Sequence, residues 1–339
     1  MTAATAVGVD RSLGYACPRC RGAVAADASE YVCRACGARF PIVLGIPDFR
    51  VFPDPWIGLA EDREKARALA ERARGASLEA MVRTYWAMTP ATPPAQANRF
   101  VEHVMQADAR SGEWIDRLPS LPTARAAAWL DIGTGTGDLA VAAARRGETV
   151  VGVDIAMRWL VVARRRAELA GASVDFVCCN AEHLPFADAT FARATAVGTI
   201  EHLHDASLML RDTRRVLRRG GDLHLRTVNR YTALPEPHVG VWGVGFVPRR
   251  FADRYVQWCS GQRYEHHRPL SARELRRELR SAGFDRVRVD AAAMMHTERA
   301  RFADRGWAVS AYDRARATPV ARGALRLVTP LLEASGVVS

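Results

Sequence analysis

Residues 126–290 of this chain alternate between apolar runs of strand length and segments with helical spacing. The expected strands are 126–130, 148–154, 174–178, 191–198, 223–228 and 284–289. Helices are expected at 139–146, from the cap at Asp205 to a stop at Gly220-Gly221, and from the capping box Ser271-Ala-Arg-Glu274 to Ala282. Strands that alternate with helices predict an α/β fold.

The flanking segments have different patterns. Residues 61–76 have a good helix composition, the prolines near residue 90 interrupt the pattern, and 95–107 restarts a helix. Four parts are therefore expected: a cysteine-rich module at 1–52, a helical linker at 53–122, the α/β domain at 123–292 with an insertion at 229–268, and a C-terminal helical extension at 293–339.

The apolar fraction of 49% is enough for a sizeable core, and the net charge of +11 is strongly basic. Nearly all of the positive charge is arginine, because Lys65 is the only lysine. The arginines are dispersed, which favours a solvated surface, although an anionic partner such as RNA or a phosphate remains an alternative. The sequence has no apolar run of membrane-spanning length, and residues 1–14 lack the apolar core of a signal peptide, so a cytoplasmic location is expected.

Cys17-Pro-Arg-Cys20 is followed after twelve residues by Cys33-Arg-Ala-Cys36. Two CxxC pairs at this distance predict a tetrahedral zinc site. Disulfides or a redox pair are the alternatives, and a cytosolic location disfavours disulfides. Four thiolates would close the coordination shell, so the ion is expected to hold the fold and not to do chemistry.

Asp131-Ile-Gly-Thr-Gly-Thr-Gly137 lies between an expected strand and an expected helix. Glycine has no Cβ and can take positive φ, so such a turn lets the backbone approach a nucleotide closely. A dinucleotide turn reads G-x-G-x-x-G, whereas the glycines here are Gly133, Gly135 and Gly137. The preceding Asp131 would repel a pyrophosphate but can face a ligand with a cationic amino-acid end.

The next two strands are also followed by polar residues. Asp154 ends its strand 21 residues after Gly133, which is about the distance expected in a βαβ unit. A carboxylate there can accept hydrogen bonds from both ribose hydroxyls. Asn180 follows the third strand, and its amide offers both an acceptor and a donor, which suits an adenine edge.

Together these motifs resemble the class I S-adenosylmethionine (SAM) dependent methyltransferases over residues 126–290, about half of the chain. The resemblance implies a Rossmann-like fold with a seven-stranded sheet that a β-hairpin completes, and it implies SAM as cofactor. In this family the region before the glycine turn often forms a lid. The resemblance places these residues at SAM: Asp131, Gly133, Thr134, Gly135, Gly137, Asp154, Ile155, Asn180, Ala181 and Glu182.

Tyr85, Trp86 and Arg99, in the expected lid, are candidates for contacts with the methionine end of SAM or with the acceptor, and packing is the alternative for each. Residues 15–49 resemble a zinc-ribbon family whose free-standing members partner RNA and protein methyltransferases, and which also occurs fused ahead of methyltransferase domains. Such a ribbon is compatible with an RNA substrate, and a purely stabilising role is the alternative.

Glu201 and His202 follow the fourth strand, and ligands bind outside the carboxyl ends of strands in open α/β sheets. His202 is a candidate base for an acceptor hydroxyl or amine, while the alternative is that both residues orient the loop and the methyl donor. Many members of the resembled family carry a similar Ile-Glu-His sequence here.

The insertion at 229–268 also follows a strand and is expected to determine substrate specificity. Tyr231, Glu236 and His238 can bind or deprotonate an acceptor. His266 and His267 are expected at the surface. The insertion also supplies aromatic residues that can wall a pocket and arginines that can meet a phosphate: Trp242, Phe246, Tyr255, Trp258, Arg249, Arg250 and Arg254.

These observations predict a SAM-dependent methyltransferase with a structural zinc ion and a small-molecule acceptor of the natural-product, sugar, quinone or prenylated type. The aromatic insertion and the lack of a concentrated basic stripe favour this acceptor class. An RNA methyltransferase that uses the ribbon and the arginines is the alternative. A non-catalytic adaptor is a third hypothesis, against which the intact Asp131, Asp154 and Asn180 argue. The oligomeric state is left open.

Overall fold

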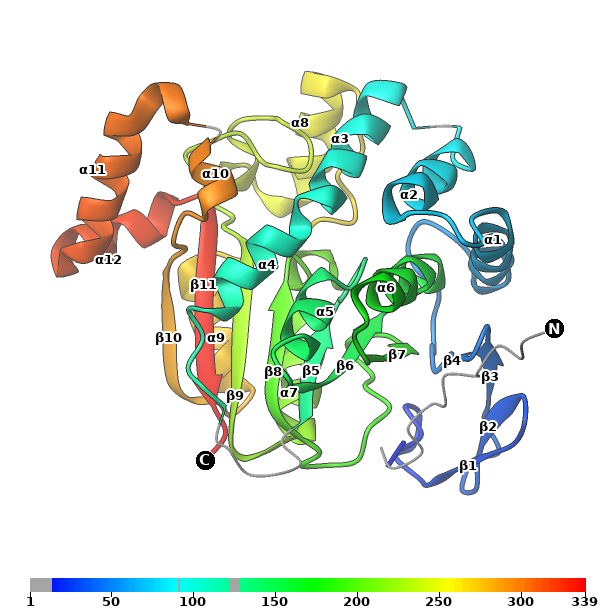
Figure 1. Cartoon of the computed structure of the whole chain (residues 1–339). Coiled ribbons are helices and arrows are strands. Elements are labelled where there is room, and N and C mark those ends of the chain that lie inside the picture. Colours follow the sequence, from blue (N-terminus) through cyan, green and yellow to red (C-terminus); the bar gives the residue numbers. More distant parts are fainter. Residues whose placement is uncertain (1–13, 91, 122–127, 301) are drawn as a thin grey trace. The chain divides into compact units, whose positions relative to one another are not determined.

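The computed structural model describes residues 14–90, 92–121, 128–300 and 302–339 (Figure 1). Seven strands form one mixed sheet in the order β10-β11-β9-β8-β5-β6-β7, and four strands form a separate small sheet. The expected α/β fold with a seven-stranded sheet is confirmed. The chain forms two compact units, residues 1–192 and 193–339, and β8 (Phe191–Val197) contains their boundary.

The small sheet of the first unit is antiparallel. Its strands are β1 (Val24–Ala26), β2 (Glu30–Cys33), β3 (Arg39–Val43) and β4 (Ile46–Pro47). An aromatic cluster forms its core: the ring centroid of Phe49 lies 5.1–5.2 Å from the rings of Tyr15, Tyr31 and Phe40. A core of so few side chains buries little apolar surface, so a module of this size is expected to need a further element, such as a bound metal ion, for its stability.

Four helices follow this module: α1 (Leu59–Arg72), α2 (Leu78–Ala87), α3 (Pro94–Met105) and α4 (Ala107–Ile115). Helices α1 and α2 pack against α6 (Met157–Ala170), and α4 packs against α5 (Asp138–Ala144) (Figure 1). The ring of Tyr85 lies 4.2 Å from that of Trp159, and the ring of Trp86 stacks on Phe100 at 4.7 Å. The packing alternative therefore accounts for Tyr85 and Trp86.

Three parallel strands carry the first unit's share of the large sheet: β5 (Ala128–Ile132), β6 (Thr149–Asp154) and β7 (Asp175–Cys178). They alternate with α5 (Asp138–Ala144) and α6 (Met157–Ala170). All of β5 is buried, including Asp131, because parallel strands are covered on both faces.

In the second unit, β9 (Leu217–Val228) and β10 (Asp285–Ala291) both pair antiparallel with β11 (Leu331–Val337). The short helices are η1 (Ile200–His202), η2 (Val244–Phe246) and η3 (Ala303–Arg305). The α-helices are α7 (Ala206–Val216), α8 (Arg249–Ser260), α9 (Ala272–Ser281), α10 (His296–Ala300), α11 (Gly306–Ala317) and α12 (Pro319–Val328).

The predicted caps of this unit are confirmed. The side chain of Asp205 accepts a hydrogen bond from the backbone N–H of Ser207 at 2.8 Å, at the start of α7. Ser271 and Glu274 form the reciprocal capping box of α9. Among the described helices, none is long and apolar enough to span a membrane.

Two sequence predictions for this unit are wrong. Gly220-Gly221 does not stop α7, because the chain enters β9 directly at Leu217, and the N–H of Gly220 donates to the carbonyl of Val338 at 2.7 Å. Residues 293–339 are not helical throughout, since β11 inserts between β9 and β10 in the sheet. In both cases pairing with a distant strand overrides the local signal.

Candidate functional site

The glycine turn joins β5 to α5 and has a backbone form that glycine adopts readily. Gly133, Gly135 and Gly137 have φ values of 70°, 52° and 78°. A Cβ added at Gly137 would lie 2.7 Å from the Cβ of Ala163 on α6, so the helix approaches closely. A Cβ added at Gly135 would have no neighbour within 4 Å. The turn therefore leaves bare backbone and open space where a ligand can approach.

Carboxylates on β5 and β6 flank this turn. Asp131 accepts a hydrogen bond from the hydroxyl of Thr134 at 2.7 Å. Asp154 accepts from the backbone N–H groups of Gly135 and Ala156, each at 2.8 Å. Burial raises the pKa of Asp154 to about 6, and the two backbone hydrogen bonds oppose this rise. A desolvated carboxylate with room for more donors fits the predicted role in binding ribose hydroxyls.

Asn180 holds the N-terminal part of the chain. Its side chain is completely buried, and its Oδ1 accepts from the N–H groups of Val51 and Phe52 at 2.8 and 3.4 Å. Its Nδ2 donates to the carbonyl of Phe52 at 3.2 Å. The amide is thus already hydrogen-bonded, and an adenine contact would have to replace these bonds. Next to it, Ala181 is half-buried and Glu182 is buried.

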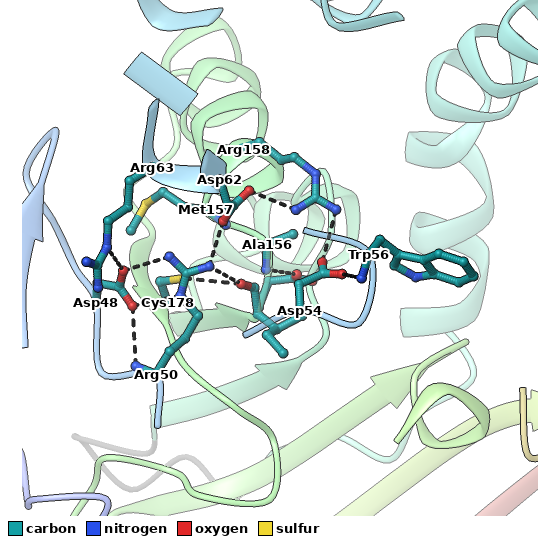
Figure 2. Close-up of polar contacts among 12 residues, drawn as sticks. Asp48, Arg50, Asp54, Trp56, Asp62, Arg63, Ala156, Met157, Arg158 and Cys178 are labelled. Atoms are coloured by element: carbon teal, nitrogen blue, oxygen red, sulfur yellow. Dashed lines mark hydrogen bonds and ion pairs between the residues drawn. The ribbon is translucent and has the colours of Figure 1, made fainter. Parts of the chain in front are cut away.

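A buried ionic network underlies the segment that follows Asp154 (Figure 2). At its centre, the carboxylate of Asp62 accepts from Arg50 at 2.6 Å, from Arg158 at 2.7 Å and from the backbone N–H of Met157 at 2.9 Å. Arg50 also donates to the carbonyl of Ile155 at 3.0 Å. The predicted cofactor residue Ile155 therefore contributes its backbone to this network.

Two further aspartates complete the network (Figure 2). Asp48 accepts from Arg50 and from Arg63, in both cases at 2.7 Å. Asp54 accepts from Arg158 at 3.0 Å. Three guanidinium groups thus face three carboxylates, and burial is compensated by near-complete pairing.

The network corrects, for some of the arginines, the interpretation of a solvated surface. Several arginines are buried and paired, so they are not available to an anionic partner. These buried residues are Arg50, Arg158, Arg166, Arg193 and Arg226. The sequence pattern gave no signal for them, because most of their carboxylate partners come from distant positions; Asp48, two residues before Arg50, is the exception.

The four cysteines of the N-terminal module meet in space, and their sulfur atoms all lie within 4.8 Å of one another. The Sγ atoms of Cys17 and Cys36 are 3.7 Å apart, and those of Cys20 and Cys33 are 3.5 Å apart. A tetrahedral zinc ion with Zn–S bonds of about 2.3 Å needs sulfur separations of about 3.8 Å. The four sulfurs therefore fit a zinc ion.

Two backbone features support this cysteine site. A Cβ added at Gly22 would lie 2.7 Å from the Cβ of Ala35 and 3.3 Å from the sulfur of Cys20, so only glycine fits beside the sulfurs. The backbone N–H of Cys36 lies 3.5 Å from the sulfur of Cys33 and lowers the pKa of that thiol to about 6. In the same cluster, the pKa of Cys17 is raised, mainly by burial, so the support for a metal site comes from the sulfur positions and from Gly22.

In the second unit, three histidines from separate segments converge: His202 at the end of η1, and His238 and His267 in the insertion. One ring nitrogen of each lies within 4.8 Å of the others. The Nδ1 of His238 lies 2.6 Å from the buried carboxylate of Glu236, and the ring of Tyr264 stacks on His267 at 5.1 Å. His267 is half-buried, so the structure agrees only in part with the surface position that the sequence predicts.

The electrostatics of these histidines differ. Burial lowers the pKa of His202, and burial together with the neighbouring imidazoles lowers the pKa of His267 to about 3. Burial alone would lower the pKa of His238 too, but the hydrogen bond and negative charge of Glu236 raise it. Near neutral pH, the imidazoles of His202 and His267 are therefore neutral, whereas Glu236 makes the neighbouring imidazole of His238 more basic.

Other predicted residues of this unit have structural contacts. Glu201 is buried and accepts from the hydroxyl of Thr227 at 2.8 Å, which supports the alternative that it orients the loop. Tyr231 packs against Phe246 with ring centroids 5.4 Å apart.

Three of the four aromatic side chains that were expected to wall a pocket are largely solvent-exposed: Trp242, Phe246 and Trp258. The fourth, Tyr255, is partly buried against the core of the insertion. The buried core of the insertion is mainly aliphatic. It comprises Val239, Val241, Val244, Ala252, Val256 and Tyr264. This core supports the segment that carries His238.

Residues 130–225 match the family model described as "Methyltransferase domain". The chain is 30% identical over 162 residues to the Ubiquinone biosynthesis O-methyltransferase of Idiomarina loihiensis, covering 48% of this chain and 63% of that protein. It is 36% identical over 134 residues to the Demethylmenaquinone methyltransferase of Thermus thermophilus, covering 39% and 57%.

Among solved structures, a phosphoethanolamine N-methyltransferase 2 of Haemonchus contortus in complex with SAM is similar, with a TM-score of 0.47 and 19% identity. That match covers 68% of this chain and 52% of the other. The chain thus spans less than two thirds of the length of each of these relatives. The matches place a methyltransferase domain in the part of the chain that contains the glycine turn and Asp154.

Proposed function

We propose that this protein is a SAM-dependent methyltransferase that transfers a methyl group to a hydroxyl oxygen of a small molecule. The observation that carries the proposal is the turn of three positive-φ glycines, whose middle amide donates a hydrogen bond to the half-buried carboxylate of Asp154. This turn and carboxylate lie within the region that matches the methyltransferase family model.

In this mechanism, an acceptor oxygen attacks the methyl carbon of the sulfonium in line with the breaking S–C bond. The electron pair of that bond returns to sulfur and leaves S-adenosylhomocysteine. The protein contributes mainly alignment and exclusion of water. Asp154 binds the ribose hydroxyls, and Asp131 faces the cationic end of the methionine moiety.

A quinol-type hydroxyl is the acceptor that we favour. One similar protein is named for O-methylation in ubiquinone biosynthesis, and another is named for a quinone, demethylmenaquinone, without a stated acceptor atom. The histidine cluster of the second unit supplies suitable chemistry, since imidazoles near neutral pH promote loss of a hydroxyl proton. In this proposal His202 and His238 act on the acceptor, while Glu236 orients His238.

The N-terminal module binds a structural zinc ion in this proposal, through Cys17, Cys20, Cys33 and Cys36. Their sulfur separations and the steric need for Gly22 support a closed four-thiolate site. The ion would stabilise the module and take no part in methyl transfer.

Calorimetric titration of the zinc-loaded protein with SAM tests the function, with Asp154→Asn as the variant and the exposed Asp188→Asn as the matched control. We expect Asp154→Asn to weaken SAM binding by about tenfold or more, as the loss of hydrogen bonds to a charged group does. Transfer of a radiolabelled methyl group to quinols and to RNA then identifies the acceptor class. Absence of SAM binding by the folded wild type would overturn the proposal, and labelling of RNA alone would overturn the acceptor.

A further inference from the structure

The histidine cluster has the composition of a metal site that is separate from the four cysteines. His202, His238 and His267 each offer one ring nitrogen, and these nitrogens all lie within 4.8 Å of one another. The ring centroids are 4.5–5.1 Å apart. Three imidazoles are the ligand set of open catalytic zinc sites, whereas structural sites have four ligands.

Glu236 has the position of a supporting residue for such a site. Its carboxylate bonds the Nδ1 of His238 at 2.6 Å and accepts from the backbone N–H groups of His238 and Val239 at 2.8 and 3.1 Å. This arrangement holds the ring and leaves Nε2 of His238 as the nitrogen for a ligand. Metal-binding histidines commonly donate their second ring nitrogen to a carboxylate in this way.

The tyrosine that stacks on the cluster has a buried hydroxyl with no hydrogen-bond partner among the described residues. The Oη of Tyr264 is buried and makes no hydrogen bond within the described part of the chain, while its ring stacks on His267. Buried polar groups are normally hydrogen-bonded. An oxygen ligand or water held at the cluster would offer such a partner.

We propose that His202, His238 and His267 bind a divalent transition-metal ion of the zinc class, with at least one coordination position open to the acceptor hydroxyl. A tetrahedral ion with Zn–N bonds of about 2.0–2.1 Å needs nitrogen separations of about 3.4 Å. From the observed limit of 4.8 Å, each pair of nitrogens has to approach by at most about 1.4 Å. Rotations of the imidazole rings provide a movement of this size.

The ion gives the proposed methylation a defined chemistry. With such an ion bound, the three imidazoles would serve as ligands and water would take the acceptor proton in their place. An acceptor hydroxyl in the open position would lose that proton more easily, because the cation would stabilise the oxyanion. The deprotonated oxygen would then form the O–CH₃ bond as the S–C bond of SAM breaks. The ion keeps its oxidation state throughout. This role rests on the proposed function, whereas the binding of the ion does not.

Metal loading of the untagged, full-length protein tests the site. After removal of metal and reloading with Co²⁺, we expect the wild type to bind one equivalent more cobalt than the double variant His202→Ala/His267→Ala. The cobalt spectrum of this additional equivalent should lack the sulfur-to-metal charge-transfer bands that the four cysteines give. His266→Ala, which alters the neighbouring histidine, is the matched control and should retain the additional ion.

A second variant guards against a folding defect. Glu236→Gln keeps the three imidazoles, and we expect it to weaken cobalt binding at this site by about 10–100-fold. Calorimetry with SAM, which binds through the first unit in our proposal, reports separately on the methyl-donor site. Equal cobalt content in the wild type and the double variant would overturn the metal site. Cobalt binding without any SAM binding would retain the metal site and overturn the proposed function.

Discussion

Replacement of Asp62 by asparagine should strongly destabilise the first unit. Each oxygen of Asp62 accepts from a different guanidinium: Oδ2 from Arg50 at 2.6 Å and Oδ1 from Arg158 at 2.7 Å. Asparagine keeps the size of the side chain, but its NH₂ group replaces one acceptor and directs hydrogens at an arginine. The three-to-three balance of charges in the network then becomes an excess of one buried positive charge.

The expected cost follows from the burial of these groups. The side chains of Asp62 and Arg50 are fully buried, and that of Arg158 is 8% exposed. Removal of one partner from a buried ion pair costs about 3–5 kcal/mol in free energy of unfolding. Replacement of an exposed residue usually changes the free energy of unfolding by no more than about 0.5 kcal/mol. The exposed Glu64 lies on the same helix, so Glu64→Gln is the control.

Urea unfolding of the two variants, followed by circular dichroism, measures this difference. The same proteins titrated with SAM provide a second result, because Asp62 also accepts from the backbone N–H of Met157, three residues after Asp154. We expect Asp62→Asn to weaken SAM binding, and Glu64→Gln to leave it unchanged. A loss of stability below about 1 kcal/mol for Asp62→Asn would refute the reasoning from buried charge.

Three other perturbations test the first unit. Burial raises the pKa of Asp154 to about 6, so SAM affinity should fall by about tenfold per pH unit below that value and level off above it. Calorimetric titrations with SAM between about pH 5 and pH 8 measure this dependence, and Asp154→Asn should remove it. Gly137→Ala should lower stability by about 1–3 kcal/mol in thermal unfolding, because its Cβ would lie 2.7 Å from that of Ala163; an unchanged melting temperature would contradict this. Chelation of zinc should melt the aromatic core around Phe49, and near-ultraviolet circular dichroism that is insensitive to chelators would argue against a structural ion.

The parts of the fold that the sequence predicted are those in which local pattern and tertiary structure agree. The closeness of the glycine turn and Asp154 could be predicted, because a βαβ unit fixes the number of residues between the first turn and the end of the second strand. The caps at Asp205 and Ser271 depend on neighbours within three residues. The spacing of the two CxxC pairs predicts that the four sulfurs lie together, and in the structure they lie within 4.8 Å of one another.

The parts that the sequence did not predict depend on residues far apart in the chain. His267 meets His202 across more than sixty positions, and no local pattern marks such a meeting. The buried positions of Arg50 and Arg158 could not be predicted, because the partner that they share, Asp62 on α1, lies 12 and 96 positions away in the chain. The hydrogen bonds of Asn180 to the backbone of Val51 and Phe52 could not be predicted either, and its contact with adenine stays a prediction.

The same attachment of residues 48–52 has a consequence for solubility. Strand β7 is the last in the order of the large sheet, and such an edge strand exposes unpaired backbone groups that invite aggregation. Here Asp48 forms a parallel bridge with Cys178 on β7, and the N–H of Phe49 donates to the carbonyl of Cys178 at 2.7 Å. The segment that follows the N-terminal module thereby covers part of this edge strand. A version of the protein trimmed to residues 123–339 would leave β7 uncovered, and self-association through this strand is the failure that an enzyme engineer should expect.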